Sequence, residues 1–559
     1  MNAPVAQINA PVLLKIQDLS VALPEGGDRP FAVQNVSLVV PEGQTLCVVG
    51  ESGSGKSVMA NAVMRLLPPR ALRVTSGRIT LEGDDLLALD TQALRRARGS
   101  RMGMIFQEPM TALNPVMTVG DQIAEVLLVH GKTDGVERER RVLELMREMN
   151  LQDPEQLRHR YPFQLSGGQR QRVVIAIAMA LEPRLLIADE PTTALDVTTQ
   201  AQILALIQRL QQEHGIGVLF ITHDFGVVAD IADQVVVMQH GQVVEGGAAA
   251  QVLRQPKHPY TRRLIDAVPR LRTNQTAPAA ASDAPLLRVE SLVKSYPARR
   301  AGLFGRKERT RTLNDVSLEI AAGETVGLIG ESGSGKTTLG QCVMRLLDVD
   351  SGRILFKGQP VQDLRGAALK ALRPEIQMIF QDPFASLNPR HRVARIVTEN
   401  AILCGVSPDE ARRRMMDVLA VVGLDPSAVN RYPHEFSGGQ RQRIGIARAL
   451  VMQPKLIVAD EAVSALDVSV QQQVLSLLRD VRQRLNLSML FITHDLRVAS
   501  QICDRIAVMH KGQIVETGTV QAIARAPQHA YTRTLFEAMP GQAWEREIER
   551  VPQADAALA

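Results

Sequence analysis

The sequence of 559 residues lacks any uninterrupted apolar run near the roughly 20 residues that a membrane-spanning helix requires. Its longest apolar run, VVIAIAMAL after Arg172, is too short and suits a buried helix. The first residues, MNAPVAQINAPVLLK, lack the charged start and apolar core of an export signal. We therefore expect a cytoplasmic protein.

Cysteine and net charge are both low. Four cysteines lie far apart, at Cys47, Cys342, Cys404 and Cys503, and none has a CxxC or other metal-ligand spacing, so we expect reduced and mostly buried thiols. The formal net charge is only +5 with both signs interleaved, which argues against a nucleic-acid-binding surface. The basic segment RRAGLFGRKERTR from Arg299 is interpreted as a solvated loop, with a lipid head-group contact as the alternative.

What the sequence does contain is a duplication. GESGSGKS at Gly50 returns as GESGSGKT at Gly330, and later segments such as LLIADEPTTALDV and HPYTRRL return in the same order. This pattern indicates two copies of a domain of roughly 270 residues and not a short solenoid repeat. We predict domains at residues 1–271 and 286–559. The segment 272–285 is rich in Ala, Pro, Ser and Thr, which is typical of an exposed linker.

Each copy contains a phosphate-binding loop between an expected strand and an expected helix. The apolar runs TLCVVG and TVGLIG precede G-x-x-x-x-G-K-[ST], and helical patterns follow it. The glycines allow backbone N–H groups to converge on phosphate oxygens. We expect Lys56 and Lys336 on the β- and γ-phosphates and the hydroxyls of Ser57 and Thr337 on Mg²⁺. The other nucleotide contacts expected from these loops are Gly50, Glu51, Ser52, Gly53, Ser54, Gly55, Gly330, Glu331, Ser332, Gly333, Ser334, Gly335 and Thr338.

Paired acidic residues follow a second buried strand in each copy. RLLIAD and KLIVAD end in Asp189 and Asp460, which we expect to reach Mg²⁺ through water. The adjacent Glu190 and Glu461 stand where a base could polarise water against the γ-phosphate. One acid at a strand end could merely cap a helix, but two in tandem beside a phosphate loop favour a catalytic function.

A histidine ends a third buried strand in each copy. GVLFITH and SMLFITH end in His223 and His494. A lone histidine is usually structural, but ligands of parallel sheets bind at the carboxyl ends of the strands, where the acids also lie. We expect each histidine to hold the γ-phosphate and orient the attacking water.

These motifs together closely resemble the ATP-binding cassette (ABC) ATPases, over nearly the whole chain and in two copies. The segment that distinguishes this family is LSGGQ at Leu165, which returns as FSGGQ at Phe436. The resemblance implies an α/β fold of two tandem domains, each a phosphate-loop RecA-like core with an antiparallel β subdomain and a helical subdomain. It also implies that the two domains pair head to tail and that each places this signature loop on the γ-phosphate held by the other. The implied contacts are Ser166, Gly167, Gly168, Gln169, Ser437, Gly438, Gly439 and Gln440.

The resemblance assigns further residues position by position. Gln107 and Gln381 match the Q-loop glutamine, which touches Mg²⁺ or the attacking water and links to the helical subdomain. Asp196 and Asp467 match the D-loop aspartate, which crosses the interface between the domains.

The residue that stacks on adenine is defined in one copy only. Tyr296 matches this position in the second copy, whereas the first copy has Leu23 there and Phe31 as a nearby substitute. The second copy also has Ala462 where the first has Pro191, a difference from which we expect little effect. Both sites otherwise have the residues that hydrolysis requires.

The segments QEPMTALNP and QDPFASLNP, with HPYTRRL and HAYTRTL near the domain ends, resemble the peptide, opine and nickel uptake branch. This implies ATP and Mg²⁺ as cofactors, two separate integral membrane permease subunits, an external solute-binding protein and a peripheral position on the cytoplasmic face of the inner membrane. Peptide is the expected solute, with nickel, opine or glutathione as alternatives. Some relatives bind an iron–sulfur cluster through cysteines near the C-terminus, and because none follows Cys503 we expect no such cluster. The HPYT segment itself predicts only a loop before a helix.

A different class of tandem ABC protein acts on ribosomes and also lacks membrane spans. Its members carry a long, charged helical linker between the halves, whereas residues 272–285 are short, mostly uncharged and contain proline. DNA-repair members contain coiled coils or zinc modules that this sequence does not show. Transport without a nucleic-acid partner is therefore the favoured interpretation.

Overall fold

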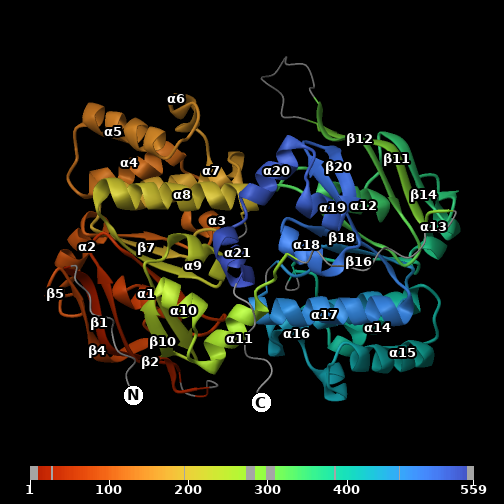
Figure 1. Ribbon diagram of the computed structural model, residues 1–559, viewed down its shortest axis with the longest axis horizontal. Coiled ribbons are helices and arrows are strands. Elements are labelled where there is room, and N and C mark those ends of the chain that lie inside the picture. Colours follow the sequence, from red (N-terminus) through yellow and green to blue (C-terminus); the bar gives the residue numbers. More distant parts are fainter. Residues whose placement is uncertain are drawn as a thin grey trace. The chain divides into compact units, whose positions relative to one another are not determined.

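The computed structural model describes residues 11–24, 26, 29–193, 195–271, 284–297, 309–382, 385–464 and 466–550. The chain forms two units that repeat one order of elements (Figure 1). The first unit comprises Met1–Leu195, Thr199–Val268 and the residues from Met539 onward, and the second comprises Asp196–Thr198 and Pro269–Ala538. Residues 272–283 of the predicted linker lie outside the described residues.

The elements of the first copy are, in chain order, β1 (Val12–Ala22), β2 (Phe31–Pro41), β3 (Thr45–Val49), α1 (Lys56–Val63), β4 (Arg73–Leu81), β5 (Asp84–Asp85), α2 (Thr91–Ser100), β6 (Met102–Ile105), α3 (Pro109–Ala112), α4 (Val119–Val129), α5 (Gly135–Glu148), α6 (Pro154–Leu157), the 3₁₀ helix η1 (Pro162–Gln164), α7 (Gly167–Met179), β7 (Leu185–Asp189), α8 (Val197–His214), β8 (Gly217–Thr222), α9 (Phe225–Ile231), β9 (Gln234–Gln239), β10 (Gln242–Ala248), α10 (Ala249–Arg254) and α11 (Pro259–Ala267).

The elements of the second copy are β11 (Leu287–Pro297), β12 (Arg309–Ile320), β13 (Thr325–Ile329), α12 (Lys336–Val343), β14 (Ser351–Phe356), β15 (Gln359–Pro360), α13 (Gly366–Leu372), β16 (Ile376–Ile379), α14 (Val393–Leu403), α15 (Pro408–Val421), the 3₁₀ helices η2 (Pro426–Asn430) and η3 (Pro433–Glu435), α16 (Gly438–Leu450), β17 (Leu456–Asp460), α17 (Val468–Leu485), β18 (Ser488–Thr493), α18 (Leu496–Ile502), β19 (Arg505–His510), β20 (Gln513–Thr519), α19 (Val520–Arg525) and α20 (Ala530–Glu537). The last helix is α21 (Gln542–Arg550).

A six-stranded sheet forms the centre of each unit. Its strand order is β10-β9-β3-β8-β7-β6 in the first unit and β16-β17-β18-β13-β19-β20 in the second. The pairs β3–β8, β7–β8 and β6–β7 are parallel, and every residue of β3, β7 and β8 is buried. Strands that are covered on both faces need continuous apolar runs, which explains why these segments do not alternate with polar residues. The carboxyl ends of these strands therefore meet at one edge.

A second, antiparallel sheet covers one face of the centre. Its order is β2-β1-β4-β5 in the first unit and β12-β11-β14-β15 in the second. In the first unit the buried residues of β1 and β4, including Leu14, Ile16 and Ile79, form one apolar cluster with Met59 of α1 and Ile187 of β7. This packing holds the helix that follows the phosphate loop between the two sheets.

Helices α4, α5 and α7 gather at the end of the first unit that lies away from β1 and β4 (Figure 1). Side chains cap the first two of these helices. Thr118 accepts from the Asp121 N–H at the start of α4, and Asp134 accepts from the Glu137 N–H at the start of α5. Helices α14, α15 and α16 occupy the corresponding positions in the second copy, and there Ser407 caps α15. The structure thus has the antiparallel β subdomain and the helical subdomain predicted for each copy.

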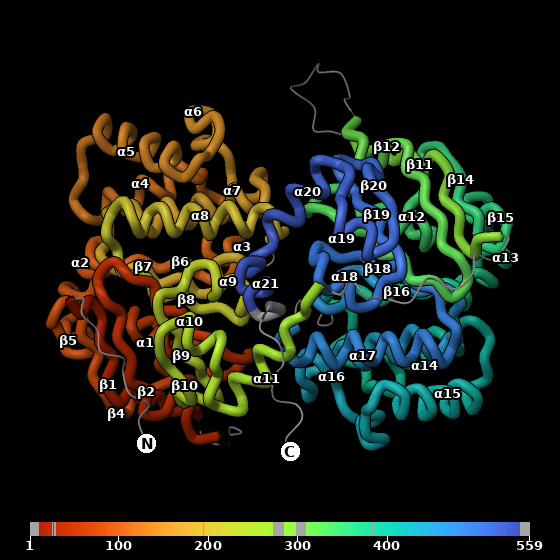
Figure 2. Tube along the Cα trace, viewed as in Figure 1, coloured from red at the N-terminus to blue at the C-terminus, as the bar shows by residue number. Residues whose placement is uncertain are grey.

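The last helix, α21, belongs to the first unit although it follows the second copy in sequence. It lies beside α9 (Figure 2), and the buried Trp544 joins the apolar cluster of the first unit. Gly541 has φ +76°, and a Cβ there would lie 2.6 Å from Gly226 Cα, so this close approach requires glycine. The Gly541 N–H donates to the Asp230 carboxylate at 2.9 Å.

Among the residues that the structure describes, no helix combines the length and the apolar character needed to cross a membrane.

Candidate functional site

The phosphate loop connects β3 to α1 in the first copy and β13 to α12 in the second. The Nζ of the buried Lys56 donates to the carbonyl oxygens of Gly50 at 2.7 Å and Glu51 at 3.0 Å. Lys336 repeats this geometry with its own loop, at 2.7 and 2.8 Å. At Gly55, with φ +102°, a Cβ would lie 2.5 Å from the Ala32 carbonyl oxygen, so only glycine permits this strand-to-helix turn.

The hydroxyl that follows each lysine contacts the carboxylate at the end of β7 in the first copy and of β17 in the second. Ser57 Oγ donates to Asp189 Oδ1 at 2.9 Å, and Thr337 Oγ1 donates to Asp460 Oδ1 at 3.2 Å. Burial, reinforced by the charge of the adjacent glutamate, raises the pKa of each aspartate to about 6 although the hydroxyl bond acts to lower it. Each copy thus brings a hydroxyl and a carboxylate together, as the Mg²⁺ prediction requires.

These oxygens suit Mg²⁺ on a nucleotide. Within the described parts of the chain, no group of three or more His, Cys, Asp or Glu side chains could hold a metal by itself. A nucleotide-bound Mg²⁺ needs only one or two protein oxygens, because phosphates and water supply the remaining ligands. Ser57 with Asp189, and Thr337 with Asp460, provide hard oxygen atoms of this kind.

Three side chains surround Glu190, which directly follows β7. Gln107 Nε2 donates to its Oε2 at 3.0 Å, Thr193 Oγ1 donates to the same oxygen at 2.9 Å, and His223 Nδ1 lies 3.3 Å from Oε1. Glu190 has φ +47°, a left-handed conformation that costs a non-glycine residue about 1 kcal/mol or more. Burial acts to raise the pKa of Glu190, but the bonds from His223 and Thr193 and nearby positive charge hold it well below its ordinary value. The carboxylate is therefore ionised and fixed in direction.

The second copy repeats the glutamine and histidine contacts, whereas Ser464, at the position of Thr193, donates to the backbone carbonyl oxygen of Glu461 at 3.0 Å. Gln381 Nε2 donates to Glu461 Oε2 at 2.8 Å, and His494 Nδ1 lies 3.4 Å from Glu461 Oε1. Burial opposes ionisation of both partners, yet their mutual hydrogen bond and charge lower the pKa of Glu461 and raise that of His494. An aspartate with a raised pKa beside a glutamate with a lowered one gives neighbouring carboxyl groups different protonation behaviour, which is typical of acid–base sites.

The signature loops begin long helices. Ser166 caps α7 by accepting from the Gln169 N–H at 3.2 Å, and the Gln169 side chain accepts from the Ser166 N–H at 3.1 Å. Ser437 and Gln440 form the same capping box at the start of α16. The second glycine of each pair also serves packing, because a Cβ at Gly168 would lie 2.6 Å from Thr199 Cγ2. Ser166 and Gly167 are exposed, as an anion-binding helix start must be.

The remaining predicted residues lie near element ends. Asp196 directly precedes α8 and accepts from Thr198 Oγ1 at 2.8 Å, and Asp467 is the N-cap residue of α17. Tyr296 lies near the end of β11, partly exposed, with Lys294 Nζ 5.7 Å from its ring centre. Phe31 begins β2 in the first copy. The functions predicted for these residues stay predictions.

Some contacts of the site involve residues that lie far apart in the chain or belong to no motif, and the sequence did not predict them. Thr193, which donates to Glu190, is the second of two consecutive threonines that match no motif. The hydroxyls of Tyr260 and Tyr531 accept from the N–H groups of Glu51 and Glu331, at 3.1 and 3.0 Å. The repetition of HPYT as HAYT was the available signal for these tyrosines.

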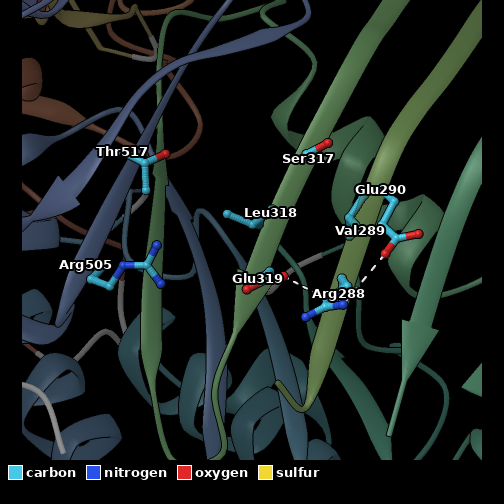
Figure 3. Close-up of a pocket in the computed structure, with 8 residues that line it drawn as sticks. All are labelled: Arg288, Val289, Glu290, Ser317, Leu318, Glu319, Arg505 and Thr517. Carbon is cyan, nitrogen blue, oxygen red and sulfur yellow. Dashed lines mark ion pairs between the residues drawn. The ribbon is translucent and has the colours of Figure 1, made fainter. Parts of the chain in front are cut away.

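A surface hollow in the second unit is not part of this site. It has a volume of about 420 Å³ and lies where β11 and β12 face β19 and β20 (Figure 3). Arg288 in its lining is paired with Glu319 at 2.7 Å, and Arg505 is paired with Glu324 at 3.1 Å. These pairs neutralise its cations, and its described lining residues include none of the predicted nucleotide contacts.

A buried strand, a lysine-bearing glycine loop, a helix and a fixed glutamate at the same sheet edge define a phosphate-loop nucleoside triphosphatase, here in two copies. The family model described as "ABC transporter" matches residues 33–193 and 313–464. A model described as "Oligopeptide/dipeptide transporter, C-terminal region" matches residues 244–295 and 515–559. The chain therefore belongs to the ABC transporter family, and it is an ATPase with two ABC domains, as the sequence predicted.

Similar proteins extend over nearly the whole chain. The glutathione import ATP-binding protein GsiA of Salmonella choleraesuis is 46% identical over 558 residues, which cover 94% of this chain and 89% of the relative. The peptidoglycan transport ATP-binding protein YejF of Agrobacterium fabrum is 46% identical over 535 residues, covering 95% and 97%. Among solved structures, a dimeric ATP-binding cassette bound to ADP and Pi is 31% identical, with a TM-score of 0.38, and covers 42% of this chain and 99% of its own.

Replacing both surrounded glutamates tests the hydrolysis step. Glu190→Gln with Glu461→Gln should slow ATP hydrolysis by roughly 10²–10⁴-fold, because the amide cannot accept a proton from water. ATP affinity, measured by equilibrium binding, should stay within about twofold because the phosphate loops are untouched. Turnover near the wild-type rate in this double variant would show that neither glutamate acts on the attacking water.

Replacing the loop lysines tests binding separately. Lys56→Ala with Lys336→Ala should weaken ATP binding by roughly tenfold or more, because each change removes a charge-assisted phosphate contact. Equilibrium binding of a fluorescent ATP analogue measures this effect. The matched control is Arg78→Ala, which removes a cation paired on the antiparallel sheet with Asp85. Equal affinities of the lysine variant and the control would contradict the assignment of the phosphate loops.

Proposed function

We propose that this protein is the ATP-hydrolysing subunit of an importer and that it holds one Mg²⁺–ATP at each of two sites. The observation that carries the proposal is the repeated glutamate cluster, Glu190 with Gln107 and His223, and Glu461 with Gln381 and His494. A chain with one degenerate copy would not keep both clusters intact. Two competent sites support a cycle in which both halves bind and hydrolyse ATP.

The residues of each copy divide the work of phosphoryl transfer to water. Lys56 leaves its own loop carbonyls for the phosphate oxygens, where its charge stabilises the transferring group. Ser57 and Asp189 would hold Mg²⁺, which would supply positive charge to offset that of the phosphates. Glu190 accepts a hydrogen bond from the attacking water, while His223 fixes the carboxylate and reaches the γ-phosphate. The second copy repeats these steps with its own residues.

In this proposal each site is completed by the signature loop of the other copy. The exposed first turn of α7 offers backbone N–H groups and the positive end of the helix to a γ-phosphate. The same loop lacks a lysine, and in sequence it follows the helical subdomain. ATP then favours the closed pair of domains because it contacts both, and hydrolysis removes that preference.

The proposed solute is a small peptide-like molecule. The relatives named above import glutathione or transport peptidoglycan, and the match to the oligopeptide/dipeptide C-terminal region supports this class. Two integral membrane permease subunits would form the pathway, an external binding protein would select the solute, and this chain would sit on the cytoplasmic face of the membrane.

The helical subdomain is the proposed docking site for the permeases. Gln107 leads directly into α3, so the γ-phosphate site is joined to this region by a few residues. Here Met110, Val116 and Val129 are exposed, with 55%, 78% and 72% of their surface accessible. Exposed apolar side chains of this kind are what a partner surface would cover. The equivalent Phe384 of the second copy lies outside the described residues.

Cysteine cross-linking tests the composite sites. Gly167 and Ser332 are exposed, so Gly167→Cys with Ser332→Cys places thiols on the signature loop of one copy and the phosphate loop of the other. A disulfide requires Cα atoms within about 7 Å, and it should form with ATP in the Glu190→Gln, Glu461→Gln background but poorly without ATP. Electrophoresis without reductant measures the product.

The control pair is Gly167→Cys with Ser52→Cys, both in the first copy, which should not cross-link. Only Cys404 needs replacement, because Cys47, Cys342 and Cys503 are buried and burial raises the pKa of each thiol. A disulfide in the same-copy pair and none in the cross-copy pair would exclude the head-to-tail arrangement.

Acidic substitutions test permease docking. Met110→Glu with Val129→Glu should reduce ATP-driven uptake in vesicles that contain the permeases by roughly tenfold or more, because an interface would bury unpaired charge. Basal ATP hydrolysis of the isolated subunit should stay within about twofold. The control, Val12→Glu, changes an exposed apolar residue on the antiparallel sheet and should transport normally. Normal uptake by the Met110, Val129 variant would place docking elsewhere.

A further inference from the structure

The HPYT and HAYT segments have an architecture that their sequence alone does not explain. Each begins a helix, α11 or α20, and its histidine is the N-cap residue. His258 Nδ1 accepts from the Tyr260 N–H at 3.2 Å, and His529 Nδ1 accepts from the Tyr531 N–H at 3.2 Å. The histidine therefore fixes the backbone of the tyrosine two residues later.

A glutamate on the last strand of each sheet fixes the start of the segment. The buried Glu245 of β10 accepts from the N–H groups of Lys257 at 2.7 Å and His258 at 3.1 Å. Glu516 of β20 accepts in the same way from Gln528 and His529, at 2.8 and 3.0 Å. Two charge-assisted bonds to consecutive backbone groups leave the segment one orientation.

The tyrosine hydroxyl of this fixed segment reaches the phosphate loop. Tyr260 Oη accepts from the Glu51 N–H at 3.1 Å and donates to the Glu51 carboxylate at 3.3 Å. The Glu51 carbonyl oxygen accepts from Lys56 Nζ at 3.0 Å. In the second copy Tyr531 Oη and Lys336 Nζ hold the two backbone groups of Glu331 at 3.0 and 2.8 Å. The residue that enters each loop is thus held by the motif tyrosine on one side and by the loop lysine on the other.

The aromatic rings are themselves immobilised. Tyr260 is 4% exposed, and the Tyr531 ring stacks on His510 with centroids 3.9 Å apart. Burial raises the pKa of Tyr531 above its ordinary value, so its hydroxyl keeps its proton at neutral pH. A rigid ring with one polar atom at its tip can set the position of a single backbone group.

We propose that Tyr260 and Tyr531 are positioning residues that hold the phosphate loops in the nucleotide-binding conformation and thereby set ATP affinity. This inference rests on the proposed ATP sites. When a nucleotide binds, the lysine transfers its hydrogen bonds from the loop carbonyls to phosphate oxygens. The tyrosine bond is made to the N–H of the residue that enters the loop and not to the lysine, so it persists and keeps the loop entrance in place while the lysine moves. The loop then loses less conformational freedom on binding.

Deleting the two hydroxyls tests this. Tyr260→Phe with Tyr531→Phe keeps both rings and should raise the KM for ATP and the Kd for ADP about fivefold, because each loop loses the hydroxyl that accepts from its entering N–H group. The kcat should stay within about twofold, because no group on the attacking water changes. Adenosine, which has no phosphate, should compete equally well against a fluorescent nucleotide on wild type and variant. A purely structural hydroxyl would lower the melting temperature and leave both the KM and the ADP Kd unchanged.

The control is Tyr161→Phe with Tyr432→Phe, which deletes the same atom from the N-cap tyrosines of η1 and η3 and should leave the ADP Kd within about twofold. Wild-type KM and Kd in the Tyr260, Tyr531 variant would overturn the inference, as would equal losses for ADP and adenosine. The lysine variants separate this failure from failure of the sites themselves. If Lys56→Ala with Lys336→Ala weakens ADP and the phenylalanine variant does not, the sites stand and the tyrosines have no positioning function.

Discussion

Parallel pairing of β3, β7 and β8 is the constraint on which the rest of the site depends. These strands are covered on both faces, so their interiors carry apolar residues and polar chemistry is confined to their ends. Their common direction then brings the phosphate loop, the Asp189–Glu190 pair and His223 to one edge. A single antiparallel strand in this set would move one of these groups to the far side of the sheet.

The two copies share the polar contacts of the carboxylates, although the side chains that make or flank these contacts differ. The hydroxyl–carboxylate bond is formed by serine in the first copy and by threonine in the second. Pro191 becomes Ala462 after the glutamate, yet both glutamates keep a left-handed backbone. Glutamine and histidine hold both carboxylates. What duplication has preserved is the direction of each carboxylate, and the flanking side chains have been free to vary.

The sequence predicted those parts of the fold and site whose signal lies within a few residues. Buried strands appear as apolar runs, and the glycine loop and the tandem acids follow them directly, so the ABC fold and its ATPase activity were predicted and confirmed. The bond from Tyr260 to Glu51 joins residues 209 positions apart, and no local pattern could pair them. The adenine-stacking residues and the function of the D-loop aspartates depend on a bound nucleotide and a second cassette, and they stay predictions.

The position of Trp544 in the core of the first unit has a consequence for biosynthesis. A chain that emerges from the ribosome with its first cassette complete still lacks α21, and the apolar surface around α9 remains uncovered. That surface is covered only after the whole second cassette has been translated. The core of the first unit is therefore complete only after the second cassette has been synthesised, although the first cassette is synthesised first. Because Trp544 is the chain's only tryptophan, its fluorescence would report this last step directly.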